Sequence, residues 1–247
     1  MAVKPPMPRK GKKRTRRTVA YIATAAVIAG LLAFFLLQAQ GGSTKPIILY
    51  VNQGNGVVNG PNFGEMLTFA SSNGFNTVFF QVYRAGVPLF TGIELSSFVN
   101  QSHAQGLKIF FALYFTNSSQ PLPATVFGLG EDGISLDVST LSLPTQQSLL
   151  ADLAACHCKT AITTTDMTSP LRPDLLILET YGAASQQYVR DGIVASVGVF
   201  ATSSLSDFQS QFRYALSNSD GVMVFDYAGL LKSGYRTPLE AATATQS

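Results

Sequence analysis

The sequence predicts an α/β protein, a small (β/α)8 TIM barrel preceded by one N-terminal transmembrane helix. Apolar, strand-like runs recur about every thirty residues, and helical patterns separate most of them. These runs are nearly continuous in apolar residues, which is typical of parallel strands buried on both faces. An uncharged apolar stretch also follows directly on a basic N-terminus.

The N-terminal region carries the membrane signal. Eight of the 17 Lys and Arg precede Thr18, and residues 18–37 form an apolar run long enough to cross a bilayer as a helix. The positive-inside bias would keep the basic tail in the cytoplasm, so the remaining chain is expected on the extracytoplasmic side of the cell membrane. A cleaved signal peptide is the alternative, although Leu37-Gln38-Ala39 is a poor cleavage site.

The expected organisation follows from this anchor. It comprises a basic cytoplasmic tail (1–17), a transmembrane helix in contact with membrane lipid (18–38), a linker (39–45), a barrel domain (46–240) and a C-terminal tail (241–247).

Charge and composition exclude several functions. Beyond residue 17, nine Lys and Arg remain against all 14 acidic residues, a net charge of −5, so no nucleic-acid partner is expected. The glycine-rich segment 54–60 lacks the spacing of a dinucleotide loop, and with only two histidines we expect neither a cofactor nor a metal. Cys156 and Cys158 stand one residue apart, too close for an easy disulfide, so we expect a fold without covalent cross-links.

Eight strands and four helices are expected in the barrel domain. The strands are 46–51, 77–82, 108–114, 133–138, 160–165, 174–179, 192–200 and 221–226. The helices are 61–74, 95–105, 144–155 and 204–216, the last with a capping-box spacing between Ser204 and Asp207. Two short crossovers, 168–173 and 182–190, leave an open doubly wound sheet as the structural alternative.

Polar residues gather where the expected strands end, and in a barrel these ends form one face. They are Asn52, Gln53, Arg84, Tyr114, Asp137, Asp166, Glu179, Tyr181, Asp226 and Tyr227. Carboxylates brought together there would repel one another unless a cation or a shared proton offsets them, and their pKa values would rise or split. Glycoside hydrolysis uses two such carboxyl groups, and Asp137 with Glu179 is the expected catalytic pair.

The other polar residues have simpler readings as well. Arg84, Tyr114, Tyr181 and Tyr227 are expected to contact substrate, as are Asp166 and Asp226. Asp166 could equally form a turn, Asp226 could cap the next helix, and Arg84 could neutralise a neighbouring acid.

Two segments carry a family resemblance. Residues 75–86 (Phe-Asn-Thr-Val-Phe-Phe-Gln-Val-Tyr-Arg-Ala-Gly) and 131–137 (Glu-Asp-Gly-Ile-Ser-Leu-Asp) resemble the glycosyl hydrolase-like TIM-barrel families of prokaryotic surface proteins, and 220–227 is similar to the last strand of many barrel glycosidases. The resemblance implies that Asp137 is catalytic or contacts sugar and that Arg84 lies near the substrate. Tyr83 is an extra residue before this arginine, and Ser135 and Val138 replace a histidine and an aspartate of the family pattern.

The sequence therefore predicts a membrane-anchored, extracytoplasmic protein related to glycoside hydrolases that acts on polysaccharide through paired carboxylates. The alternative is a noncatalytic, degenerate barrel that binds glycan or a protein partner at the cell surface. The absence of tryptophan, the usual stacking ring of sugar subsites, favours this alternative, although Tyr83, Tyr114, Tyr181 and Tyr227 could substitute.

Overall fold

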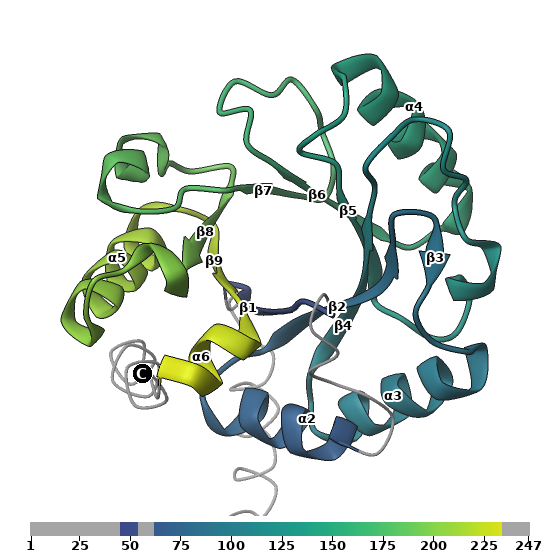
Figure 1. Ribbon diagram of the computed structural model, residues 1–247, viewed down its shortest axis with the longest axis horizontal. Helices are drawn as coiled ribbons and strands as arrows, with labels where there is room; N and C mark the ends of the chain where they lie inside the picture. Colours follow the sequence, from purple (N-terminus) through teal and green to yellow (C-terminus); the bar gives the residue numbers. More distant parts are fainter. Residues whose placement is uncertain (1–44, 54–61, 234–247) are drawn as a thin grey trace, which may run out of the picture. The chain divides into compact units, whose positions relative to one another are not determined.

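A computed structural model describes residues 45–53 and 62–233, and these form a closed barrel (Figure 1). Eight strands pair in the order β1-β9-β8-β7-β6-β5-β4-β2, and β1 pairs with β2 to close the cylinder. Every one of these pairings is parallel. The predicted (β/α)8 barrel is confirmed, and closure excludes the open doubly wound sheet.

The barrel strands lie close to their predicted positions. They are β1 (Ile47–Val51), β2 (Thr77–Arg84), β4 (Lys108–Tyr114), β5 (Gly133–Asp137), β6 (Lys159–Thr164), β7 (Leu175–Leu178), β8 (Val194–Gly198) and β9 (Gly221–Phe225). A further strand, β3 (Val87–Pro88), is short, pairs antiparallel with the end of β2 and was not predicted from the sequence.

The longer helices surround the barrel and cover its outer face (Figure 1). They are α2 (Phe63–Ser72), α3 (Gly92–Ala104), α4 (Leu143–Leu153) and α5 (Leu205–Asn218), followed by the short α6 (Tyr227–Ser233). The predicted cap of α5 is present, because the Ser204 side chain accepts a hydrogen bond of 3.1 Å from the Asp207 N–H. The segment 165–174 contains no helix, and a 3₁₀ helix (Ala183–Tyr188) joins β7 to β8.

A β-bulge in β2 decides which way its last residues face. Gln81 pairs with Ala112 of β4 and Tyr83 with Leu113, so Val82 has no partner and is the extra residue. The side chains of Val82 and Tyr83 both lie in the outer apolar layer, between the strands and the helices, where Tyr83 packs on Phe115. Side-chain alternation then turns Arg84 inward. The extra residue before the arginine is therefore absorbed by the strand without changing the direction of Arg84.

The barrel has two apolar layers. The outer layer lies between strands and helices and holds most of the buried residues, among them Phe80 of β2 and Phe98 of α3, whose rings stack with centroids 4.2 Å apart. The inner layer fills the interior of the barrel and consists of Ile48, Tyr50, Phe79, Phe110, Ala112, Ala161, Ile177, Val194 and Met223. Gly133 has no room for a side chain, because a Cβ there would lie 2.6 Å from the Lys159 carbonyl oxygen.

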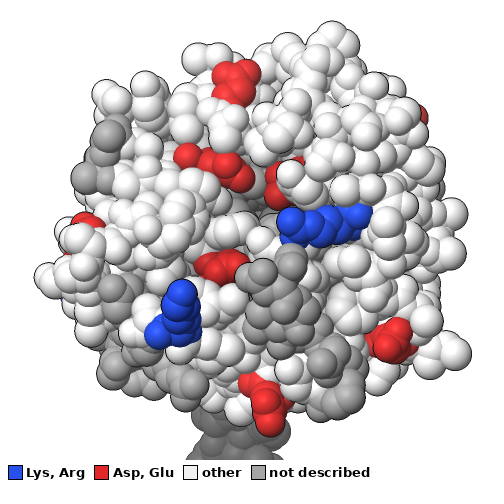
Figure 2. Space-filling view, viewed as in Figure 1, with Lys and Arg blue, Asp and Glu red and all other residues white. Residues whose placement is uncertain are grey.

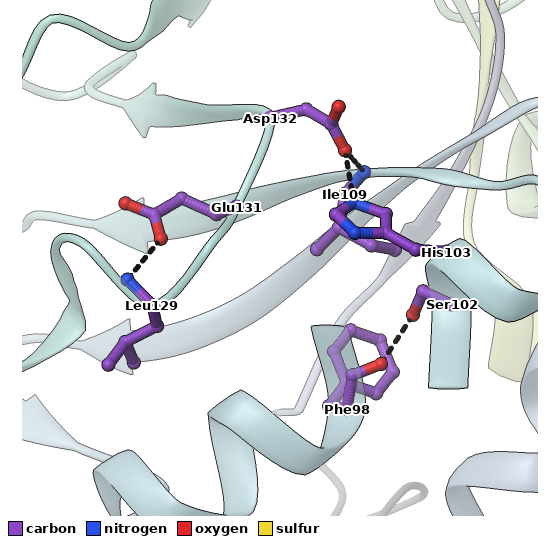
Figure 3. A network of polar contacts seen from close by, with 7 residues as sticks. All are labelled: Phe98, Ser102, His103, Ile109, Leu129, Glu131 and Asp132. Carbon is purple, nitrogen blue, oxygen red and sulfur yellow. Dashed lines mark hydrogen bonds and ion pairs between the residues drawn. The ribbon is translucent and has the colours of Figure 1, made fainter. Parts of the chain in front are cut away.

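The acidic pair that opens the 131–137 motif has a structural role (Figure 3). The Asp132 carboxylate accepts a 2.8 Å hydrogen bond from the Ile109 N–H of β4 and lies 2.9 Å from His103 Nε2 of α3. The Glu131 carboxylate accepts hydrogen bonds from the N–H groups of Gly128 and Leu129. These contacts fix the entry of β5, whereas Asp137 lies at its other end.

The expectation of a fold without cross-links is wrong, because Cys156 and Cys158 form a disulfide. The residue between them, His157, has a φ of 53°, a left-handed conformation that turns the backbone back on itself. The two Cα atoms consequently lie 5.2 Å apart, within the range that a disulfide spans.

The predicted basic tail and membrane helix lie outside the described residues, as do segment 54–60 and the C-terminal tail. Within residues 45–53 and 62–233, no helix combines the length and apolar character needed to cross a bilayer.

Candidate functional site

A cavity of about 220 Å³ lies at the carboxyl ends of the strands. Its lining comprises Tyr50, Asn52, Gln81, Arg84, Tyr114, Asp137 and Phe225. Figure 2 shows acidic side chains around a central depression of this end of the barrel, with a basic side chain at its border. The closed barrel therefore brings together residues that lie far apart in the sequence.

Asp137 and Glu179 lie at the same level of the barrel. In tilted strands, interior residues from alternate strands form layers of four, and the ladder registers place Gln81, Asp137, Glu179 and Phe225 in one layer. The Glu179 N–H still bonds the Thr164 carbonyl of β6 at 3.1 Å, which continues the ladder beyond β7. Only β6 separates the two strands, so their backbones lie about 10 Å apart and the inward side chains converge.

Asp137 is almost fully buried, with 9% of its surface exposed. Its Oδ2 lies 3.5 Å from the Tyr50 hydroxyl and its Oδ1 lies 3.4 Å from the Ser139 hydroxyl, both as hydrogen-bond acceptors. Burial raises the pKa of Asp137 to about 6, while the hydrogen bonds from Ser139 and Tyr50 and the charge of Arg84 limit the rise. This carboxyl group can therefore gain or lose a proton near neutral pH.

The pKa of Glu179 is also raised. Burial raises its pKa to about 7, and the nearby Asp137 carboxylate adds to the rise. The inward ring of Tyr181 follows on the same strand end and contacts Phe200 and Phe225. Burial, together with the charge of Glu179, raises the pKa of Tyr181, so its hydroxyl stays protonated and can donate a hydrogen bond.

Arg84 faces the cavity from β2. Its Nη1 donates hydrogen bonds to Asn52 Oδ1 at 3.1 Å and Gln81 Oε1 at 3.5 Å, and its guanidinium lies 5.5 Å from the centre of the Tyr114 ring. The Gln81 amide oxygen also accepts a 3.0 Å hydrogen bond from the Gln53 N–H. These contacts hold the arginine in one orientation at the edge of the cavity.

Five of the sequence-predicted site residues are not in the lining of this cavity: Glu179 and Tyr181, which face the barrel interior, and Asp166, Asp226 and Tyr227. Asp166 is exposed and accepts hydrogen bonds from the Thr168 N–H and hydroxyl, which forms a turn and lowers the pKa of the aspartate. Asp226 is half-buried and caps α6 by accepting a 2.9 Å hydrogen bond from the Gly229 N–H; burial nevertheless raises its pKa. Asp166 therefore forms a turn and Asp226 caps a helix, which are the structural roles that the sequence left open as alternatives.

Tyr227 points away from the barrel interior. It packs on Phe69 of α2 in the outer layer and lines a larger groove, about 610 Å³, between α2 and α6. The only titratable acid in the lining of that groove is Glu65. Because the groove lacks paired carboxylates, we place the site at the barrel mouth.

Three residues of the cavity, Tyr50, Gln81 and Phe225, were not predicted from the sequence. Tyr50 and Phe225 lie within apolar strand runs, where an aromatic residue is expected in the core. The signal that could have found them is alternation: each stands two residues after an inner core residue, Ile48 or Met223, and therefore faces inward.

Comparison with known proteins supports the fold assignment. No protein-family model matches the chain, and no curated protein matches its sequence. Among solved structures, a GH113 β-mannanase, AaManA from Alicyclobacillus acidocaldarius in complex with ManMIm, is 10% identical with a TM-score of 0.57, over 83% of this chain and 98% of the other. CpGH84B is 8% identical with a TM-score of 0.53, over 81% of this chain and 48% of the other.

A third structure, dihydrodipicolinate synthase from Aquifex aeolicus, is 12% identical with a TM-score of 0.47, over 81% of this chain and 76% of the other. At such identities the first two matches establish similarity of fold.

The chemistry available at the mouth is general acid–base catalysis by two carboxyl groups. Asp137 and Glu179 have pKa values of about 6 and about 7, so near neutral pH one can be ionised while the other carries a proton. The part of the chain that the structure describes contains no group of three or more His, Cys, Asp or Glu arranged to hold a metal ion.

Proposed function

We propose that this protein is a membrane-anchored, extracytoplasmic glycoside hydrolase that cleaves polysaccharide through Asp137 and Glu179. The observation that carries the proposal is the placement of these carboxyl groups in one barrel layer at the mouth, with the pKa of both raised. Hydrolysis of a glycosidic bond requires one carboxyl group that protonates the leaving oxygen and another that attacks or activates water.

The two pKa values suggest which residue takes which role. Glu179, with the higher pKa, is the general acid that donates its proton to the glycosidic oxygen. Asp137 has the lower pKa and accepts hydrogen bonds from Tyr50 and Ser139, so it is the carboxylate that acts as nucleophile or base. Arg84 favours the ionised form of Asp137 through its charge.

The fold comparisons agree with this proposal. A GH113 β-mannanase and CpGH84B share the barrel, and the β-mannanase matches over nearly its full length. Because fold alone does not specify activity, the proposal depends on the carboxyl pair and uses the comparisons as support.

Anchoring rests on the N-terminal sequence and gains support from the disulfide. The basic segment and the apolar run of residues 18–37 suit a single-pass anchor with the barrel outside the cytoplasm. A disulfide between Cys156 and Cys158 suits the same location, because disulfides persist in oxidising compartments.

The test is release of reducing sugar from a panel of polysaccharides by the full-length protein. Asp137→Asn and Glu179→Gln are each expected to lower the rate by at least about 100-fold, the usual contribution of a positioned acid or base. Asp152→Asn is the matched control, because Asp152 is an exposed carboxylate on α4. Cleavage that survives both mouth substitutions would refute the proposal.

A second candidate is a barrel that binds glycan without cleaving it. Two observations favour it: the cavity holds only about 220 Å³, and Asp137 is 91% shielded from solvent where a nucleophile must reach substrate. For this function, sugars would bind and wild-type protein would release no reducing ends from any member of the panel.

A further inference from the structure

Arg84 has unused hydrogen-bonding capacity. Its Nη1 contacts the neutral amide oxygens of Asn52 and Gln81, and within the described residues its Nε and Nη2 have no hydrogen-bond partner. In the same part of the chain, the contact between His103 and Asp132 is the only pairing of a basic with an acidic side chain within 4 Å, so no carboxylate pairs with Arg84. A guanidinium presents five donors in a planar fork, and most of them remain available here.

The arginine is also positioned in advance. The bulge at Val82 turns it inward, the two amide oxygens hold its Nη1, and the Tyr114 ring lies against the guanidinium. A side chain held in this way loses less conformational entropy when a ligand binds. The remaining donors border the cavity and are therefore available to a bound ligand.

We propose that the cavity recognises an acidic sugar, a hexuronate unit whose carboxylate is bound by the Arg84 guanidinium. This inference rests on the proposed glycan-directed function and adds the substrate class. A planar carboxylate can accept two parallel N–H hydrogen bonds from a guanidinium, which gives both binding energy and orientation.

The size and layering of the site agree with one acidic ring. A cavity of about 220 Å³ is smaller than the roughly 300–1,000 Å³ of pockets for drug-sized ligands, so its described part suits a single sugar unit. Arg84 lies further along β2 than Gln81, which shares the layer of Asp137 and Glu179. A carboxylate on Arg84 therefore lies nearer the rim than the two carboxyl groups, which reduces repulsion between them and the ligand.

The test compares D-glucuronate with D-glucose, which carries a neutral CH2OH group where glucuronate has its carboxylate. Binding of each to the full-length protein in detergent is measured by titration calorimetry or ligand-observed NMR. We expect glucuronate to bind at least about tenfold more tightly than glucose, the effect of one charge-assisted contact. Arg84→Gln should remove this preference, so that glucuronate binds no more tightly than glucose.

Two further variants sharpen the result. Arg213→Gln makes the same chemical change on the exposed face of α5 and should leave the preference for glucuronate intact. Arg84→Lys keeps the charge but not the fork, and should retain only part of the preference. Thermal unfolding of each variant shows that it is folded before binding is measured.

Equal affinity for both sugars in the wild type, or a glucuronate preference that survives Arg84→Gln, overturns the inference. This binding test and the hydrolysis test can fail independently of each other. Glucuronate preference without cleavage refutes the hydrolase and retains the acidic-sugar site, whereas cleavage of polysaccharide by a wild type that binds glucuronate and glucose equally does the reverse.

Discussion

Asp137 and Glu179 share one layer of the barrel interior although β6 separates their strands. Their raised pKa values predict a bell-shaped pH dependence of kcat/KM with its maximum between about 6 and about 7. Activity should rise with pH as Asp137 ionises and fall as Glu179 loses its proton. An initial-rate series across this range checks it, and a rate that keeps rising above pH 8 would contradict the assigned roles.

Asp137 should also make the folded protein less stable at high pH. Between its ordinary pKa of 3.8 and its folded value of about 6, the folded state binds more protons than the unfolded state, so the free energy of unfolding falls as pH rises through this window. Asp137→Asn removes this cost and should stabilise the protein at pH 8 by up to about 3 kcal/mol. Urea unfolding at pH 4 and pH 8 checks it; an equal effect at both would exclude the linkage.

The bulge in β2 predicts an unusual tolerance to deletion. Without Val82, Gln81 would face inward, Tyr83 outward and Arg84 inward, so the regular alternation of a strand would keep the arginine at the mouth. We expect this deletion to cost the packing of one buried valine, about 2 kcal/mol, and to retain the preference for glucuronate. Deletion of both Val82 and Tyr83 should turn Arg84 outward and abolish that preference.

The disulfide should contribute modestly to stability. It closes a very short loop, for which the chain-entropy estimate is about 1.5 kcal/mol. The double substitution Cys156→Ser with Cys158→Ser should therefore lower the unfolding free energy by no more than this amount, as measured by denaturant titration. A much larger loss would mean that the cross-link holds the start of β6 in place.

Much of the fold follows from local sequence patterns. Runs such as residues 109–113 of β4 are apolar throughout because parallel strands in a barrel are buried on both faces, so their positions can be predicted. The closure of the sheet into a barrel could be inferred only indirectly, from the number of strands. The hairpin strand β3 and the bulge at Val82 have no distinct residue signature, because both depend on pairing between strands.

The candidate site was predictable in part for a related reason. Asp137, Glu179 and Arg84 are polar residues at the ends of apolar runs and so are conspicuous in the sequence. Asp166 and Asp226 have the same appearance, yet their carboxylates bond nearby backbone N–H groups, a difference that only local geometry reveals. Tyr50 resembled a core residue because one tyrosine can pack its ring and still direct its hydroxyl at an acid.

Strand β7 gives the barrel wall a weak sector. It has only four residues, its ladder with β8 consists of Ile177–Val194 and Leu178–Ala195, and no α-helix covers either of its connections. Local opening should begin there, and its amide protons should exchange with deuterium faster than those of β2 or β4. The proposed proton donor, Glu179, therefore stands on the part of the scaffold that can shift most readily when a sugar enters.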